Sequence, residues 1–209
     1  MQNNINSTLV DVRKAYRLLF DFQSRIMDLV SFIGGTYAFE YDGGHIKFSN
    51  IAPSNGKGSL KDSAWRFLPM YFYDFHFKQR KINNNNIYFS VFLIADTGYF
   101  ENLKDNLPNK KDVDTFHSVE ESKTKLLFVA GKNKWGNSSL NDQNWNNIEF
   151  TLQDSGIDIK DVDGGIMIFK SYELNNFLDE DKAMETMRNF QYFARQHSID
   201  FIIKEKDLQ

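Results

Sequence analysis

Residues Ala64–Asp96 read AWRFLPMYFYDFHFKQRKINNNNIYFSVFLIAD, and this stretch decides the fold. It holds two runs of aromatic and β-branched residues, which favour strands, on either side of a basic, Asn-rich segment. Strand side chains alternate between two faces, so one face of the first run carries Tyr71, Tyr73, Phe75 and Phe77. The other face carries Phe72, Asp74, His76 and Lys78. The second run, Ile87–Asp96, is apolar on both faces, which is typical of a covered central strand.

The flanking sequence predicts helices at both ends of the chain and further strands between them. An apolar pattern with helical spacing covers Thr8–Ile33 and ends at Gly34-Gly35. Asp179 is placed to cap a second helix, Glu180–His197. Other segments have strand patterns: a hairpin with its turn at Asp42-Gly43-Gly44, and single strands at Lys125–Ala130 and Ile166–Lys170.

This order of elements predicts an α+β fold rather than alternating βαβ units. We expect a single antiparallel or mixed sheet of about five to seven strands, with the N-terminal and C-terminal long helices packed on one face. The sequence has no internal repeat and no sharp change in composition. Residues 1–209 are therefore interpreted as one domain.

Composition limits the classes of function. The chain is 41% hydrophobic and 15% aromatic, which is typical of a globular protein and not of a disordered one. Its formal net charge is −3 and its pI is about 5.8. A generic nucleic-acid binder usually carries an excess of basic residues, so the acidic pI disfavours nucleic acid as a partner.

The chain has no cysteine, which excludes disulfides, thiolate catalysis and cysteine-based zinc sites. No signal peptide is evident and no apolar run is long enough to span a bilayer, so we expect a cytoplasmic protein with no membrane partner. We assign no cofactor and no metal ion from the sequence, because no motif for either is present.

Asp74 and His76 interrupt the less apolar face of the first large strand. A carboxylate that orients an imidazole is a common acid–base arrangement, and the same groups can bind a metal. Across a four-residue turn, Asp74 would lie near Ile94 or Ala95, within a residue or two of Asp96. One alternative function is therefore a small metal-dependent hydrolase or nuclease that uses Asp74, His76 and Asp96.

A second alternative is single-stranded nucleic-acid binding. Lys78, Arg80 and Lys81 form a basic segment between the two large strands, close to aromatic residues. Basic and aromatic side chains together can bind phosphates and stack on bases. The same charges also suit a solvated hairpin end that discourages pairing with other strands.

Our main interpretation is a non-catalytic protein–protein interaction protein, such as an accessory, inhibitory or immunity-type subunit of a larger bacterial or phage system. The sequence has no catalytic signature and is rich in aromatic residues, which are enriched at interaction hot spots. Trp135 and Trp145 each lie in a polar, Asn-rich segment and are the predicted exposed anchors. The predicted partner is another protein.

Overall fold

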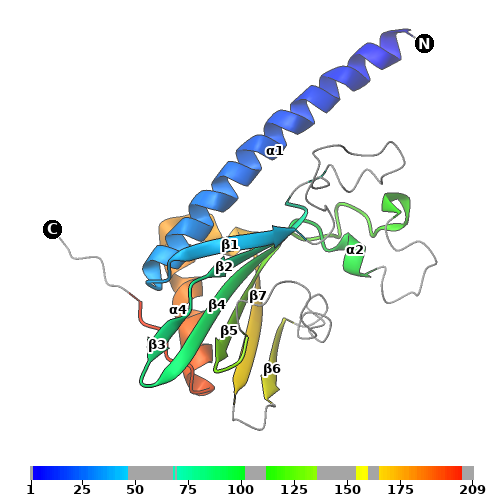
Figure 1. Cartoon of the computed structure of the whole chain (residues 1–209). Coiled ribbons are helices and arrows are strands. Elements are labelled where there is room, and N and C mark those ends of the chain that lie inside the picture. The colour runs from blue at the N-terminus through cyan, green and yellow to red at the C-terminus, as the bar shows by residue number, and fades with distance from the viewer. Residues whose placement is uncertain are drawn as a thin grey trace, which may run out of the picture.

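The computed structural model describes residues 2–46, 68, 70–101, 112–135, 154–159 and 165–203. Its described strands form one seven-stranded antiparallel sheet in the order β1-β2-β4-β5-β7-β6, and β3 also pairs with β4. The strands are β1 Tyr41–Ile46, β2 Phe72–Phe77, β3 Arg80–Ile82, β4 Asn85–Ile94, β5 Lys125–Lys132, β6 Ser155–Ile159 and β7 Ile166–Glu173 (Figure 1).

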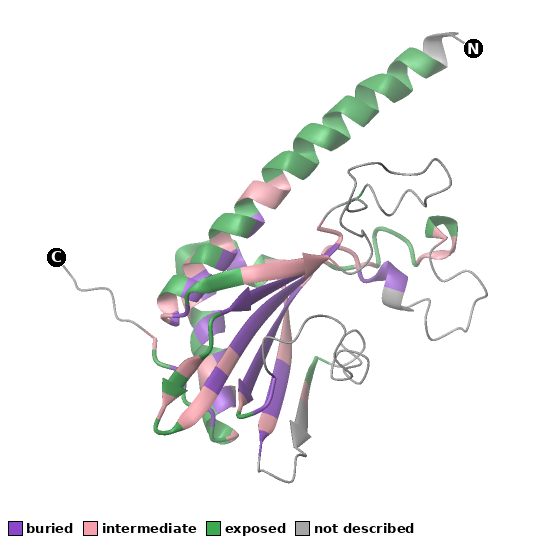
Figure 2. Cartoon of the chain, viewed as in Figure 1, coloured by how far each residue is buried: buried purple, intermediate pink, exposed green. Residues whose placement is uncertain are grey.

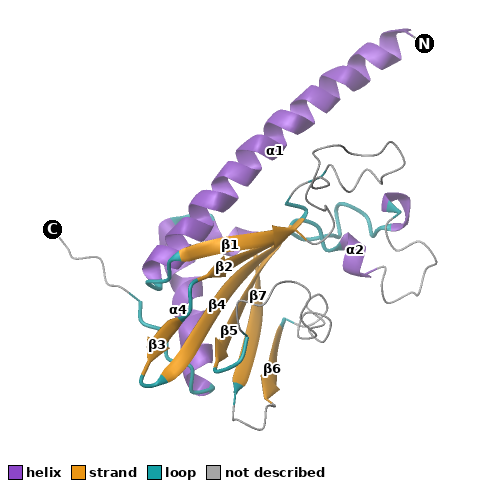
Figure 3. Cartoon of the chain, viewed as in Figure 1, coloured by secondary structure: helices purple, strands orange, loops and turns teal. Residues whose placement is uncertain are grey.

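Two long helices lie on one face of this sheet (Figure 3): α1, Gln2–Thr36, and α4, Glu180–Gln196. Both contribute to one hydrophobic cluster with the sheet, which includes Ile33 of α1, Phe190 of α4 and Phe89 of β4. The Tyr37 hydroxyl, just after α1, donates a hydrogen bond to the backbone carbonyl of Met187 in α4 at 2.6 Å. The predicted α+β fold class is confirmed.

The predicted central hairpin is present, but its turn is tighter than expected. Asn83 and Asn84 alone form the turn, both with positive φ (48° and 64°). Asn tolerates this left-handed conformation better than most residues. Lys78 and Gln79 separate β2 from β3, and the resulting register places Asp74 opposite Phe92 rather than opposite Ile94 or Ala95.

The short hairpin predicted around Asp42-Gly43-Gly44 is wrong. These residues lie inside β1, a single edge strand that pairs with β2. The register shifts between Tyr41 and Gly43, and Gly43 has a φ of 128°. The Asp-Gly-Gly sequence therefore supports a β-bulge, where glycine adopts a conformation that other residues avoid.

Helix α1 begins six residues before the predicted start and continues through Gly34-Gly35. Gly34 is required by packing, because a Cβ at this position would collide with the Phe77 ring. The C-terminal part of the helix is packed on the sheet, whereas every residue from Ile5 to Asp21 is exposed (Figure 2). None of the described helices has the combination of length and apolar character that a bilayer crossing requires.

The face of the sheet away from the two helices has its own hydrophobic cluster. It contains Phe72, Phe92 and Trp135 together with residues of β5 and β7. Tyr71 packs against this cluster, not with Tyr73 and Phe75 as the alternation predicted, because β2 begins only at Phe72.

Candidate functional site

A chain of polar side chains crosses β2 and β4 on the face away from the helices. His76 and Ser90 are register partners, and His76 Nδ1 lies 2.9 Å from Ser90 Oγ. On the other side of the imidazole, His76 Nε2 lies 2.6 Å from Asp74 Oδ2. All three side chains are buried. The structure thus brings together the Asp74–His76 pair that the sequence predicted and adds Ser90 to it.

The fourth member of this polar chain is Trp135, which follows β5. Its indole Nε1–H donates a hydrogen bond to Ser90 Oγ at 3.0 Å. Ser90 can then donate its own proton to His76 Nδ1, which leaves the imidazole proton on Nε2, facing Asp74. The order of donors and acceptors is that of a carboxylate–imidazole–hydroxyl relay.

The buried carboxylate of Asp74 is the member of this polar group whose hydrogen-bonding capacity is least satisfied. Its contact with His76 Nε2 is short but poorly directed, so neither carboxylate oxygen has a hydrogen-bond partner among the residues that the structure describes. Burial raises the pKa of Asp74 to about 6, despite the opposing effect of His76. A buried carboxyl without donors favours its neutral form, so Asp74 titrates close to neutral pH.

His45 of the edge strand β1 extends this polar group. It is the register partner of Asp74, and its ring lies 5.3 Å from the ring of His76. Burial and the neighbouring His76 lower the pKa of His45. Within the part of the chain that the structure describes, no group of three or more His, Asp or Glu side chains is placed to hold a metal ion.

Asp96 lies apart from Asp74 and His76. It follows β4 by two residues, four positions beyond the partner of Asp74. Its carboxylate Oδ1 accepts a hydrogen bond from the backbone N–H of Gly98 at 2.8 Å, which supports the turn into the short helix α2, Gly98–Glu101. The expected convergence of three polar groups is therefore limited to Asp74 and His76, and Asp96 has a local role.

The predicted exposed anchors and the predicted basic segment are placed as follows. Trp135 is buried, so the expectation of an exposed Trp135 is wrong, and Trp145 lies outside the described residues.

In the predicted basic segment, Lys78 Nζ contacts Glu40 at 2.5 Å. Arg80 donates to the Tyr37 carbonyl at 2.9 Å and lies over the Phe39 ring, while Lys81 is exposed. Lys78 and Arg80 thus have partners within the protein.

A second candidate site is the exposed part of α1, where large apolar side chains reach solvent. Tyr16 and Phe20 are each 72% exposed, and the other exposed members between residues 5 and 20 are Ile5, Leu9, Val10, Val12, Leu18 and Leu19. Most of these lie on one side of the helix. We define the apolar face of α1 as Ile5, Leu9, Val12, Tyr16 and Leu19, which follow one another at spacings of three and four.

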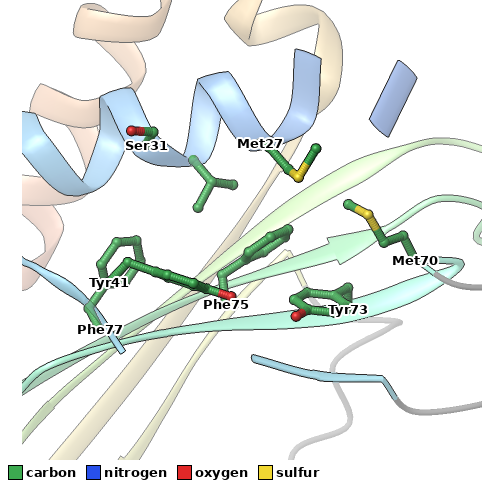
Figure 4. A pocket seen from close by; sticks show the side chains of 8 residues that line it. Met27, Ser31, Tyr41, Met70, Tyr73, Phe75 and Phe77 are labelled. Carbon is green, nitrogen blue, oxygen red and sulfur yellow. The ribbon is translucent and has the colours of Figure 1, made fainter. Parts of the chain in front are cut away.

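A pocket of roughly 300 Å³ lies where α1 meets the sheet. Figure 4 shows Met27 and Ser31 on α1 facing Tyr73 and Phe75 on β2. Tyr41, Met70, Phe77 and Val30 complete the lining, which is mostly apolar. Burial raises the pKa of Tyr41, and the neighbouring Tyr73 hydroxyl adds to this effect. The pocket suits an apolar side chain.

Comparison with known proteins places the chain in a family. The family model for PM0109 matches residues 2–199. The chain belongs to the PM0109 family. An uncharacterized protein PM0109 from Pasteurella multocida (strain Pm70) is 58% identical over 31 residues, which is 15% of this chain and 15% of that protein. No solved structure matches the chain.

Two features of this PM0109-family protein escaped the sequence analysis. Ser90 reads as a small residue within an apolar strand, and its pairing with His76 depends on the register. The exposed part of α1 has the same apolar spacing as its buried part, so periodicity predicts one continuous buried face. Only the length offered a signal, because the helix is much longer than the mean α-helix of soluble proteins, about 12 residues.

Proposed function

We propose that this PM0109-family chain is a non-catalytic protein–protein interaction protein, which binds its partner through the apolar face of α1. Accessory, inhibitory and immunity-type roles all fit this activity. The observation that carries the proposal is the uninterrupted exposure of Ile5–Asp21 in a helix whose apolar pattern is that of a packed one.

The energetics of a projecting helix support this proposal. In proteins, most of the stability of a helix comes from packing of its apolar face rather than from the intrinsic helix propensity of its residues. Monomeric proteins rarely expose large contiguous apolar patches unless these are interaction sites. The exposed Leu9, Tyr16 and Leu19 therefore call for a surface that covers them.

The polar side of α1 argues for a protein partner rather than a lipid surface. Three acidic residues are interspersed there with four basic ones: Asp11, Asp21 and Asp28 with Arg13, Lys14, Arg17 and Arg25. Helices that lie on membranes usually carry an excess of Lys and Arg on the polar side. A mixed polar side keeps the helix hydrated without drawing it toward anionic lipids.

The pocket beside Met27 supplies an anchor point next to the apolar face. Interaction energy is concentrated where a large side chain of the partner fills a pocket away from water. On α1, Met27 lies about two turns and Ser31 about three turns beyond Leu19 and Phe20, so a single partner segment can contact both the face and the pocket.

A matched pair of neighbouring leucines tests the proposal. Leu19 lies on the apolar face, and Leu18 lies on the opposite side of the helix although it is more exposed (71% against 42%). The unmodified chain, Leu19→Asp and Leu18→Asp are each immobilised, and proteins captured from an extract of the source organism are quantified by mass spectrometry. We expect Leu19→Asp to lose a specific partner about tenfold and Leu18→Asp to retain it. Equal capture by all three chains would contradict the proposal.

The Asp74–His76–Ser90 contacts favour one other function, a hydrolase with Ser90 as nucleophile. His76 is within hydrogen-bond distance of Ser90 and faces Asp74, which is the order of groups that activates a serine. A fluorophosphonate probe tests this candidate, because it labels activated serines covalently. Labelling that disappears in Ser90→Ala would favour the hydrolase, and an unlabelled unmodified chain would reject it.

A further inference from the structure

We infer that the apolar face of α1 binds a second copy of the same chain, as an antiparallel pair of helices centred near Lys14. This inference rests on the proposed function, because it names the occupant of the same surface. It is carried by three features of α1: the spacing of the apolar face, the length of the exposed segment and the point at which the domain begins.

The spacing is that of a helix-pairing seam. From Ile5 the apolar face advances by four, three, four and three residues to Leu19, which is the heptad pattern of paired helices. The same alternation continues through Gln23 to Ile26, Val30 and Ile33, and these last three are buried against the protein's own sheet. The exposed segment thus continues the seam that is packed on the sheet, and its apolar side chains would also be stabilised by a surface that covers them.

The position of the domain selects the antiparallel arrangement. In a parallel pair, the seams of both helices would have to face each other from Ile26 onward, where each is already covered by its own sheet. In an antiparallel pair, the two domains lie at opposite ends of the paired segment. The overlap then runs from Ile5 to Gln23 in both copies, about 28 Å of helix, and ends just before the buried part begins.

This register is self-complementary. It places Leu9 of one copy opposite Leu19 of the second copy, and Val12 opposite Tyr16. Each large side chain of the apolar face then meets another apolar side chain, except Ile5, which meets Gln23. Arg13 of each copy flanks the axis, so the like charges oppose association and added salt should strengthen the pair.

The rest of the described structure offers no competing helix within the chain. The other long helix, α4, has its apolar side buried in the core through Ala183, Met187, Phe190 and Ala194. A second copy, in contrast, brings a seam of the same length and pattern. We therefore favour self-association over an intramolecular partner among the described residues.

The absence of cysteine allows a direct test of the register. Leu9→Cys and Leu19→Cys are prepared as separate single-cysteine chains of different tag length, then oxidised alone and as a mixture. We expect a disulfide between the two variants in the mixture, at least tenfold above the homodisulfides formed by either variant alone. A homodisulfide of Leu9→Cys with none in the mixture would indicate a parallel pair and overturn the inference. Leu18→Cys mixed with Leu9→Cys is the control, and no disulfide is expected there.

The mass in solution separates this inference from the proposed function. Light scattering coupled to gel filtration should give the unmodified chain and Leu18→Asp twice the 24.5 kDa chain mass, and Leu19→Asp a single chain mass. A monomeric unmodified chain overturns self-association. If that monomer still loses an extract partner on Leu19→Asp, the proposed function stands without self-association. If that monomer instead sediments with anionic phospholipid vesicles and Leu19→Asp does not, a lipid surface replaces the second copy.

Discussion

The two faces of the central hairpin carry different kinds of side chain. On the helix-covered face, Phe89 of β4 lies among the rings of Tyr37, Phe77, Phe128, Phe190 and Phe201 at centroid distances of 5.3 to 6.1 Å. On the other face, the same strands place Asp74, His76 and Ser90 beside Phe72 and Phe92. One face depends on close packing of aromatic rings, and the other combines packing with a buried polar chain.

This comparison teaches that burial on both faces does not require the same chemistry on both. Strand β4 is covered on each side, as its apolar run predicted. Buried polar groups cost free energy unless they are hydrogen-bonded. The buried Asp74 carboxylate on the polar face therefore lowers the stability of the folded protein. The helix-covered face should therefore respond to changes in volume, and the polar face to changes in charge and hydrogen bonding.

The largest expected effect is a cavity on the helix-covered face. Phe89→Ala should lower the free energy of unfolding by about 4 to 5 kcal/mol. The surrounding rings belong to β2, β5, α4 and the segments that follow α1 and α4, so they cannot collapse together into the cavity. Phe92→Ala, the matched change on the other face, should cost about 3 kcal/mol. Its ring contacts include Phe72 at 6.0 Å and Trp135 at 5.9 Å.

Urea denaturation followed by fluorescence and circular dichroism measures both values, provided that the m-value is unchanged between variants. The ranking is the informative part. A larger loss for Phe92→Ala than for Phe89→Ala would show that the polar face carries more of the packing energy, and the comparison of the two faces would be reversed.

The next effect depends on pH and belongs to Asp74. Its pKa in the folded protein, about 6, lies above its ordinary value of 3.8. The folded state therefore binds this proton more tightly than the unfolded state, and the stability it contributes is fully present below about pH 4 and lost as pH rises through 6. Asp74→Asn stays neutral, so its stability relative to the unmodified chain should rise as the pH increases from about 4 through 6 and should level off above about pH 7.

The expected gain of Asp74→Asn approaches roughly 3 kcal/mol at pH 8 and vanishes near pH 4. Free energies of unfolding measured at intervals between pH 4 and 8 give the profile. Phe89→Ala is the control, because it removes no titratable group and its difference from the unmodified chain should not change with pH. A difference for Asp74→Asn that is the same at every pH would contradict the assignment.

The sequence predicted the fold class and the Asp74–His76 pair because both depend on short-range patterns. Alternation within one strand is enough to put Asp74 and His76 on the same face. The predicted four-residue turn, however, misplaced β4 relative to β2. The two-residue turn at Asn83-Asn84 and the break at Lys78–Gln79 both shift the register, and their combined effect pairs His76 with Ser90.

The same reasoning explains why Asp96 and Trp135 were misplaced. Asp96 moves away from Asp74 with that shift of register, and its carboxylate is held by the N–H of Gly98. Trp135 lies in a polar segment, so its surroundings in sequence suggest exposure. Its burial depends on Ser90 and Phe92, which are more than forty residues away along the chain. Contacts of that kind follow from topology, which local patterns do not encode.

The smallest expected effect is the loss of the Trp135–Ser90 hydrogen bond. Trp135→Phe keeps an aromatic ring beside Phe92 but removes the indole N–H, which should lower the free energy of unfolding by about 1 kcal/mol beyond the packing change. A double-mutant cycle with Ser90→Ala isolates that hydrogen bond from the packing terms. We expect a coupling of about 1 kcal/mol between the two positions. If the coupling is near zero while Ser90→Ala alone is destabilising, Ser90 stabilises the protein through its contact with His76 and not through its hydrogen bond with Trp135. The polar face would then consist of an Asp74–His76–Ser90 group with a tryptophan merely packed over it.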